Sequence, residues 1–378
     1  MLKVGIAGAR GISNIEGFQA HPEEVVISAI CDLNEDVAKT AAEKYNIPKY
    51  YRIFEDMLES DLDAVVISTP MQLHVPQTIA ALEAEKHVLS EVAAGVTMDE
   101  LWWLIEAVER SGKAYMFAEN CCYIPQNCVI KEMVKAGLFG KPYFGEGEYI
   151  HEIKSMAQYP NGKASWRKYW QLGKRGAFYP THSIGPVMQW FGNDRIESII
   201  CTSSGQNMAR EFGLRQDDTT ITLCKTTGGS LIKLRVDCMS PRPHNNLYYS
   251  LQGTKGCYEA PRGFGDEHKI WLESMDGDAN NPQWQPLSAF YDEFLPQRYK
   301  SATAEQKQAG HGGSDFYIVG HFLDAVIRGA HPAVDVYEAC EWTAVGLLSE
   351  LSVTNDCRQM KMPDFRKNMP ISEQIIAL

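Results

Sequence analysis

The order of apolar and polar positions divides the chain into two parts. In the first part, short apolar runs alternate with segments whose apolar residues recur at helical spacing. Five runs are expected to be strands, Leu2–Ala7, Val25–Cys31, Ala64–Ser68, His87–Ser90 and Ala114–Ala118. Four segments are expected to be helices, Ile12–Ala20, Glu35–Tyr45, Val75–Glu85 and Met98–Ser111. Strict alternation of strands and helices predicts a doubly wound α/β sheet of parallel strands, covered on both faces.

The pattern changes near residue 119, where strand-like runs begin to follow one another. A helix is expected first, at Pro125–Ala136. The runs after it are Tyr143–His151, Arg195–Ser203, Thr219–Thr226, Ser230–Cys238, Leu247–Gly253 and Lys269–Glu273. The polar segment Asp276–Pro286 is expected to be a loop, and Asp315–Arg328 and Val336–Ser352 are expected to be closing helices. Consecutive strands predict an α+β domain built on an open, mostly antiparallel sheet.

Length and charge narrow the class of protein. The 378 residues exceed the roughly 100–200 residues of one domain, so we expect a first domain at residues 1–120 and a second at residues 121–378. A formal net charge of −12 argues against a nucleic-acid or anionic-membrane partner. All apolar runs are shorter than the roughly 20 residues of a membrane helix. The first predicted strand starts at Leu2 without a signal peptide. Both observations favour a cytoplasmic protein.

Ten cysteines are spread along the chain. Only Cys121 and Cys122 are adjacent, and most of the others stand in apolar runs, where cysteine behaves as a small core hydrophobe. We therefore expect buried thiols in a reducing compartment. We expect no metal site.

The turn after the first predicted strand has the composition of a phosphate-binding site. It contains Gly8, Ala9, Arg10, Gly11 and Ile12. Glycine lets the backbone approach a pyrophosphate, and the following helix N-terminus supplies amide donors. Arg10 stands where the second glycine of the G-x-G-x-x-G pattern belongs, so the pattern is incomplete. A glycine-rich turn that holds no ligand is the alternative.

Asp32 ends the second predicted strand, at the spacing where an acid binds the adenosine ribose hydroxyls. Its carboxylate would repel a 2′-phosphate, which favours NAD over NADP. Arg10 is the opposing signal, because its guanidinium suits either the pyrophosphate or a 2′-phosphate. The alternative role for Asp32 is the N-cap of the predicted helix Glu35–Tyr45.

Two further segments resemble the Gfo/Idh/MocA oxidoreductase family, which includes glucose–fructose oxidoreductase and inositol dehydrogenase. They are the run Val66–Pro70 with His74, and the run Ala84–Glu91. The resemblance implies an NAD-binding Rossmann domain followed by a domain with the substrate site and the contacts of a homo-oligomer. It also implies a set of residues that line the dinucleotide, namely Thr69, Pro70, His74, Glu91 and Asn120.

The usual active-site residues of the family's dehydrogenases are replaced. Most of them have Glu-Lys-Pro where this chain has Glu91, Val92 and Ala93. They also carry an aspartate and a histidine where this chain has Pro180 and Ile184. Ordinary alcohol dehydrogenation therefore loses its expected proton acceptor.

Other segments are similar to the NAD-dependent glycosidase (α-N-acetylgalactosaminidase-like) branch of the family. They are Glu119–Tyr123, Tyr149–His151, Tyr179–Pro186, Ser240–Pro243 and His311–Phe316. The resemblance implies catalytic roles at the reacting sugar for Tyr149, Tyr179 and His182. The residues expected to bind the carbohydrate substrate are His151, Arg242, His244, His311 and Asp315. His244 stands where the branch often has tyrosine.

The branch implies a redox-neutral reaction on a small carbohydrate. The sugar is oxidised at C3, the C1 substituent is eliminated, water adds, and the ring is reduced again, so NAD is not consumed. Two other functions fit the sequence. One is a net NAD-dependent sugar or polyol dehydrogenase, and the other is an NAD-binding protein without catalysis.

Each candidate residue also has a structural alternative. Tyr149 and His151 suit a strand face packed on the sheet, and Tyr179 and His182 suit the start of a helix near Ser183. The segment around His311 suits a turn before the closing helices. A further aromatic cluster suits either sugar stacking or the core, and we leave it out of the catalytic set; it comprises Trp166, Arg167, Tyr169 and Trp170.

Overall fold

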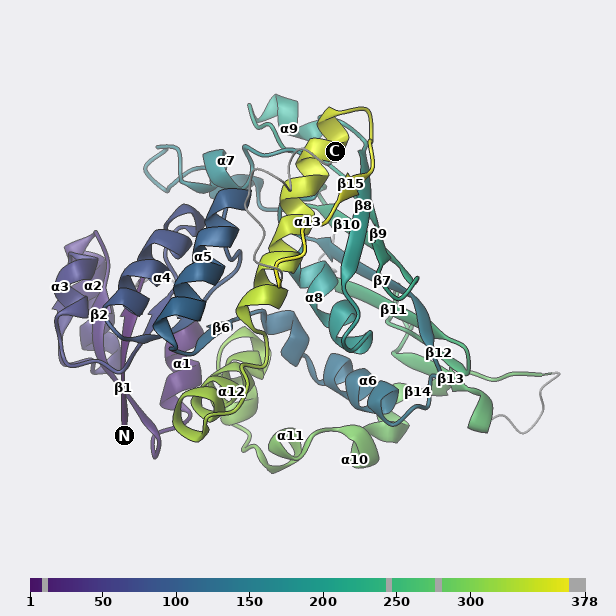
Figure 1. Ribbon diagram of the computed structural model, residues 1–378, viewed down its shortest axis with the longest axis horizontal. Coiled ribbons are helices and arrows are strands. Elements are labelled where there is room, and N and C mark those ends of the chain that lie inside the picture. The colour runs from purple at the N-terminus through teal and green to yellow at the C-terminus, as the bar shows by residue number, and fades with distance from the viewer. Residues whose placement is uncertain (9–12, 243–246, 276–280, 367–378) are drawn as a thin grey trace. The chain divides into compact units, whose positions relative to one another are not determined.

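A computed structural model describes residues 1–8, 13–242, 247–275 and 281–366 (Figure 1). Two compact units are formed. The first unit comprises Met1–Tyr123, Ser301–Cys340 and residues 365–366, and the second comprises Ile124–Lys300 and Glu341–Asp364. The sequence analysis assigned all residues after 120 to one second domain. In the structure, Ser301–Cys340 packs with the first unit instead.

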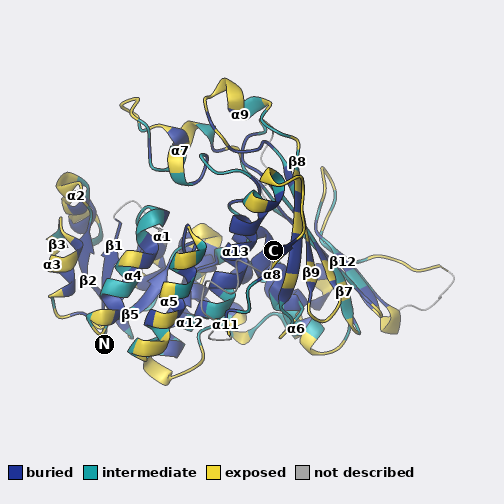
Figure 2. Ribbon diagram, turned by 45° about the horizontal axis from the view of Figure 1, so that its top comes forward, coloured by how far each residue is buried: buried dark blue, intermediate teal, exposed yellow. Residues whose placement is uncertain are grey.

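The first unit is built on a six-stranded sheet with the order β3-β2-β1-β4-β5-β6. All of its strand pairs are parallel. The strands are β1 (Leu2–Ala7), β2 (Val25–Cys31), β3 (Tyr50–Tyr51), β4 (Ala64–Ile67), β5 (His87–Ser90) and β6 (Tyr115–Phe117). All four residues of β4 are buried, as expected of a strand covered on both faces. The neighbouring strands β1 and β5 are also mostly buried (Figure 2). The doubly wound parallel sheet is confirmed.

Helices of the first unit follow the predicted pattern closely. They are α1 (Ser13–Gln19), α2 (Glu35–Tyr45), α3 (Phe54–Leu58), α4 (His74–Glu83), α5 (Met98–Ser111) and α12 (Ser314–Arg328). The short elements β3 and α3 were not predicted, because two to five residues show no clear period. Helix α12 packs against α1 at Gly17, where a Cβ atom would lie 2.8 Å from the Asp315 carbonyl oxygen.

The second unit is built on a nine-stranded sheet with the order β14-β13-β12-β11-β7-β10-β9-β8-β15. Among the described strands of this sheet, β7 and β10 are the only pair that is parallel. The strands are β7 (Pro142–Ile150), β8 (Ile196–Ser203), β9 (Thr220–Thr226), β10 (Leu231–Asp237), β11 (Leu247–Gly253), β12 (Gly256–Glu259), β13 (Lys269–Leu272), β14 (Gln285–Pro286) and β15 (Met360–Lys361). The mostly antiparallel sheet is confirmed. Of the segment expected to be a loop, residues 276–280 lie outside the described part of the chain and residues 281–284 form no helix or strand. The prediction was wrong for Gln285–Pro286, which form β14.

Helices of the second unit are mostly short. They are α6 (Pro125–Lys135), α7 (Arg167–Trp170), α8 (Thr181–Trp190), α9 (Met208–Glu211), α10 (Tyr291–Phe294) and α11 (Gln297–Ser301), and the boundary between the units falls within α13 (Val336–Thr354). Helix α8 lies against β7 because two glycines leave room for it. A Cβ atom on Gly147 would lie 1.9 Å from the Ser183 carbonyl oxygen, and one on Gly145 would lie 2.6 Å from Val187 Cγ1.

All ten cysteines lie in the described part of the chain, and no disulfide joins them. Eight are buried, while Cys257 is half-buried and Cys357 is exposed. Burial raises the pKa of Cys31 to about 12 and that of Cys128 to about 11, so these thiols remain protonated near neutral pH. Among the described residues, no helix is long and apolar enough to cross a membrane.

Candidate active site

The residues expected at the cofactor follow the carboxyl ends of parallel strands in the first unit. Asp32 follows β2, Ser68 and Thr69 follow β4, and Glu91 follows β5. In a parallel sheet these ends meet at one edge, and ligands bind there beside the point at which the strand order reverses. The order reverses between β1 and β4. The dinucleotide position is therefore the edge beside these two strands.

Gly8 allows the backbone to pass close to that edge. Its φ is +97°, and a Cβ atom would lie 2.4 Å from the Ser68 carbonyl oxygen. Only glycine fits such a position, and a bare backbone is what a pyrophosphate needs. This cradle fits a dinucleotide. The remaining residues of the expected turn, Ala9, Arg10, Gly11 and Ile12, lie outside the described part of the chain.

Asp32 is not the N-cap of α2, so that alternative is wrong. The N-cap residue is Asn34, and Asp32 Oδ1 accepts a hydrogen bond from the Asn34 backbone N–H at 2.9 Å. Its carboxylate also adds to the effect of burial in raising the pKa of Cys31. An acid held in this way at the end of β2 suits the ribose hydroxyls of an adenosine.

His74 holds the loops after β4 and β5 together. It is 2% exposed, with Nε2 at 2.8 Å from the Thr69 carbonyl oxygen and Nδ1 at 2.8 Å from the Ala93 carbonyl oxygen. Burial lowers the pKa of His74, and the carbonyl oxygens only partly oppose that effect. Thr69 Oγ1 donates to Gln77 Oε1 at 2.5 Å. The loop that contains Thr69 and Pro70 is thus fixed by two part-buried hydrogen bonds.

Asn14 is a residue that the sequence analysis missed. It lies in the first turn of α1, is fully buried, and its Nδ2 donates to Glu91 Oε1 at 2.6 Å and to Ser68 Oγ at 3.2 Å. The available signal was a polar residue directly after the glycine-rich turn. Asn120, which was expected at the dinucleotide, lies just after β6, and its Oδ1 accepts a long bond of 3.7 Å from Cys121 Sγ.

The structure brings the three predicted catalytic residues of the second unit together. Ring centroids are 4.8 Å apart for Tyr149 and His182, 5.0 Å for Tyr179 and His182, and 5.9 Å for Tyr149 and Tyr179. The predicted substrate residue His151 joins them, because Tyr149 Oη lies 2.6 Å from His151 Nδ1. We call these four residues the protic cluster.

Backbone position explains why the protic cluster forms. Tyr149 lies on the same face of β7 as Gly145 and Gly147, which is the face that α8 covers. His182 is in the first turn of α8, and its carbonyl oxygen accepts from Tyr249 Oη at 2.6 Å.

Of the structural alternatives for the protic cluster, helix capping is wrong and packing on the sheet is confirmed for Tyr149. The N-cap residue of α8 is Pro180, and no side-chain cap bond is made there, so neither Tyr179 nor His182 caps this helix. Tyr149, however, also packs against the buried cluster that includes Val236 and Met239. It therefore has a packing role as well.

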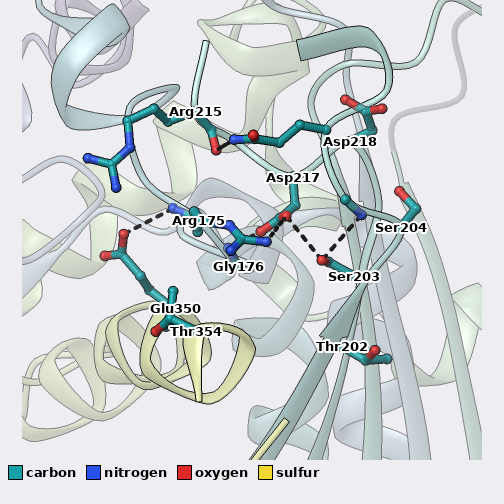
Figure 3. A network of polar contacts seen from close by, with 12 residues as sticks. Arg175, Gly176, Thr202, Ser203, Ser204, Arg215, Asp217, Asp218, Glu350 and Thr354 are labelled. Carbon is teal, nitrogen blue, oxygen red and sulfur yellow. Dashed lines mark hydrogen bonds and ion pairs between the residues drawn. The ribbon is translucent and has the colours of Figure 1, made fainter. Parts of the chain in front are cut away.

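A buried carboxylate anchors the loop that leads to Tyr179. Asp217 accepts hydrogen bonds from Arg175 Nη2 at 2.8 Å, from the Gly176 N–H at 2.8 Å and from Ser203 Oγ at 3.0 Å (Figure 3). Gly176 has a φ of +69°, and a Cβ atom would lie 2.7 Å from the Glu350 backbone nitrogen. Arg175 and Gly176 were not among the predicted site residues, and in the structure they anchor this loop to Asp217.

A second aspartate anchors the segment that contains Arg242. At the end of β10, Asp237 Oδ1 accepts from the backbone N–H groups of Met239 at 3.0 Å and Ser240 at 2.8 Å. Its other oxygen accepts from Ser240 Oγ at 2.6 Å. Arg242 is exposed, while His244 lies outside the described residues.

His311 and Asp315 lie in the first unit, not in the second. His311 begins a 3-10 turn, as its structural alternative predicted, and its Nδ1 lies 2.9 Å from Asp315 Oδ1. The Asp315 side chain is 1% exposed and the His311 side chain is 40% exposed. A buried carboxylate therefore orients a histidine that is open to solvent.

The aromatic cluster around α7 is not core. No residue of α7 is buried, and Tyr169 is 61% exposed. The Arg167 guanidinium lies 4.4 Å from the centroid of the Trp166 ring. The core alternative is therefore wrong for these residues.

The chain combines a parallel sheet, with Gly8 and Asp32 at its ligand edge, and a mixed sheet that carries the protic cluster. These features define an NAD-binding enzyme of oxidoreductase fold. Comparison with protein families agrees with this class. Residues 2–119 match the oxidoreductase family with an NAD-binding Rossmann fold, and residues 123–371 match the C-terminal domain of glycosyl hydrolase 109.

Curated relatives extend this match over almost the whole chain. An α-N-acetylgalactosaminidase of Shewanella oneidensis is 32% identical over 401 residues, which cover 97% of this chain and 85% of the relative. A glycosyl hydrolase family 109 protein of Solibacter usitatus is 30% identical, with coverages of 97% and 88%. The chain therefore belongs to glycosyl hydrolase family 109.

Solved structures confirm the fold. A levoglucosan dehydrogenase in complex with NADH and L-sorbose has a TM-score of 0.82 at 18% identity, and the match covers 97% of this chain and all of that one. An NAD binding oxidoreductase from Klebsiella pneumoniae has a TM-score of 0.77 at 17% identity, with coverages of 96% and 99%. The cofactor of the Rossmann domain is NAD.

Proposed function

We propose that the enzyme cleaves glycosides without net oxidation of the sugar. When bound, NAD supplies the redox chemistry, taking a hydride from C3 of the ring and later returning it. The protein has to hold the ring, take a proton from C2, assist departure of the C1 substituent and admit water.

The observation that carries the proposal is the protic cluster. Its catalytic members are three protic rings whose centroids lie within 5.9 Å of one another. Where the resemblance implies the lysine, aspartate and histidine of the family's dehydrogenases, this chain has Val92, Pro180 and Ile184. The chain thus has groups for local proton transfer but lacks the usual acceptor for net alcohol oxidation.

Position suggests a role for each member of the cluster. We assign the C2 proton to Tyr179, because a neighbouring imidazole stabilises a phenolate and can relay its proton. His182, at 5.0 Å between ring centroids, is that neighbour and the proton shuttle. Tyr149 shares a proton with His151 across 2.6 Å and binds a ring hydroxyl. A positioned acid or base contributes roughly 10²–10⁴ in rate.

The same proposal covers the substrate and cofactor contacts. The residues that bind the carbohydrate are His151, Arg242, His244, His311 and Asp315. The residues that hold NAD are Gly8, Ala9, Arg10, Gly11, Ile12, Asp32, Thr69, Pro70, His74, Glu91 and Asn120. His74 acts from a buried position by fixing the loop of Thr69. The substrate is a small glycoside, and an α-N-acetylgalactosaminide is the first one to test, since a relative bears that name.

Function is divided along the chain in this proposal. Residues 1–120 bind NAD, and residues 121–378 supply the substrate site and the contacts of a homo-oligomer. Neighbouring strands of the second unit expose Ile200, Leu223 and Leu231, which are 39%, 40% and 38% exposed. Light scattering of the wild type and of Leu223→Glu tests self-association through this surface. Cytoplasmic location is part of the proposal, and cell fractionation tests it.

A panel of nitrophenyl α- and β-glycosides, with and without added NAD, tests the activity. Nitrophenol release and NADH absorbance are followed together. Many turnovers of nitrophenol without accumulation of NADH are expected. Accumulation of NADH from free sugars or polyols, with no release of nitrophenol, would establish a net dehydrogenase instead. NAD binding without either activity would establish a non-catalytic protein.

A further inference from the structure

A buried amide links the first helix of the NAD-binding unit to two strand ends. Asn14 is 0% exposed. Its Nδ2 uses both hydrogens, one toward Glu91 Oε1 at 2.6 Å and one toward Ser68 Oγ at 3.2 Å. Ser68 directly follows β4 and Glu91 directly follows β5. One side chain therefore ties α1 to both strands on the far side of the reversal in strand order.

The oxygen of the Asn14 amide indicates that a contribution to stability does not by itself explain why asparagine stands at this position. Asn14 Oδ1 is buried and has no hydrogen-bond partner among the residues that the structure describes. A buried acceptor without a partner costs about 1–3 kcal/mol by the usual measure. Positions that tolerate such a cost are commonly held for function. We therefore attribute the function of Asn14 to the two N–H donors of its amide.

Strand order places Glu91 on a different part of the dinucleotide from Asp32. Asp32 follows β2 and Glu91 follows β5, with β1 and β4 between these strands. Three strand spacings amount to about 14 Å. The two carboxylates thus lie on opposite sides of the reversal, where the two halves of a dinucleotide bind. Asp32 takes the adenosine half, so Glu91 is left with the nicotinamide half.

We propose that Asn14 is a positioning residue that fixes the Glu91 carboxylate for the nicotinamide half of NAD. The inference rests on the proposed role of Glu91 in NAD binding. A short bond from the Asn14 amide holds the Glu91 carboxylate in one orientation at the ligand edge of the sheet. Without this bond, the flexible Glu91 carboxylate would sample several rotamers.

A purely structural role for Asn14 leads to a different prediction. If Asn14 only held α1 in place, its loss would weaken every nucleotide that the first unit binds. A positioning role through Glu91 weakens NAD but spares AMP, which contains only the adenosine half. The two ligands therefore separate the two roles.

The experiment is calorimetric titration of the full-length protein with NAD and with AMP, using Asn14→Ala, Glu91→Ala and the double variant. We expect Asn14→Ala to raise the NAD dissociation constant about tenfold, the effect of one bond to a charged group, and to leave that of AMP unchanged. In the Glu91→Ala background, the same substitution should have no further effect.

Two controls keep the test decisive. Ser68→Ala removes only the longer bond and should leave both dissociation constants within about twofold. Asp32→Ala should weaken NAD and AMP together. Asn14→Asp keeps the volume of the side chain, so it remains informative if Asn14→Ala does not fold. It places one carboxylate against another, and we expect a larger loss of NAD affinity than with alanine.

Equal losses for NAD and AMP, or independent effects of Asn14→Ala and Glu91→Ala, would overturn the proposal. The titrations involve no turnover. A failure of the glycosidase proposal therefore leaves their outcome unaffected, and a failure here leaves the protic cluster as it stands.

Discussion

The two units hold their candidate functional residues by different means. In the first unit, buried side chains tie strand ends and the loops after them together, as Asn14 and His74 do. In the second unit, the protic cluster lies beside loops that aspartates anchor through charged and backbone donors.

This difference follows from what each unit has to do. A dinucleotide needs backbone at close and constant distance, so buried side chains hold the backbone around it. Proton transfer needs side chains that exchange protons with their surroundings, so the side chains of the protic cluster remain partly exposed. The loops beside them are held in place by buried aspartates. Cofactor binding is therefore assigned to the first unit and proton transfer to the second. Substitutions in the first unit should change NAD affinity, and substitutions in the protic cluster should change turnover.

Tyr179→Phe should give the largest effect and confine it to turnover. The change removes one hydroxyl from the protic cluster, so we expect kcat to fall by roughly 10²–10⁴ while the NAD dissociation constant stays the same. Tyr143→Phe is the matched control, because Tyr143 is 47% exposed at the beginning of β7. A variant of Tyr179 that binds NAD poorly would contradict the separation of the two units.

Asp217→Ala should lower the free energy of unfolding by about 3 kcal/mol, because it leaves Arg175 and the Gly176 N–H without their carboxylate. Urea unfolding measures this loss. Ser203→Ala removes one neutral donor and should cost about 1 kcal/mol. The exposed Asp292 provides the control for loss of an acidic side chain. An Asp217 variant as stable as the wild type would show that the loop before Tyr179 is held by something else.

Gly8→Ala should weaken NAD by about 2 kcal/mol, or roughly 30-fold, because a Cβ atom would overlap the Ser68 carbonyl group. Fluorescence titration with NAD measures the change. Gly112→Ala is the matched control: Gly112 also has a positive φ, of +63°, but a Cβ atom there meets nothing within 4 Å. Equal effects of the two substitutions would show that strain, and not the cradle, limits binding.

The buried His74 should give the smallest effect, a pH dependence of stability. Its pKa in the folded protein is below the ordinary value of 6.5, so the unfolded chain binds more protons as the pH falls. The contribution of His74 is therefore complete above about pH 6.5 and is lost as the pH falls through the folded pKa. The loss amounts to about 1.4 kcal/mol for each pH unit that separates the unfolded pKa from the folded pKa.

Thermal unfolding from pH 7.5 to pH 5 measures the His74 effect. His74→Gln should be less stable at pH 7.5 and lose less stability on acidification than the wild type. His331→Gln, with a side chain that is 74% exposed, should follow the wild type. Parallel pH profiles for His74→Gln and the wild type would contradict the role of burial.

Much of the fold could be predicted because periodicity is a local property. The bounds of α2 and α5 agree with the sequence analysis, and Asp32 was placed at the end of β2 from its spacing alone. Elements such as α3 and α9 escaped because a few residues do not define a period. The packing of Ser301–Cys340 with the first unit depends on contacts between distant parts of the chain.

The candidate site divides in the same way. Tyr149, Tyr179 and His182 were selected by resemblance, and the structure brings them together. Asn14 and Asp217 were missed because each acts on partners far away in the sequence, on Glu91 and on Arg175. No spacing rule indicates such ties.

The central claim is that the sugar loses and regains the proton at C2 during cleavage. The most direct measurement is turnover of an accepted nitrophenyl glycoside in D₂O with NAD present, followed by NMR of the released sugar. The account predicts deuterium at C2 of the product, with nitrophenol released and NADH not accumulating. Nitrophenol release that leaves hydrogen at C2 would contradict it and would indicate hydrolysis by direct displacement.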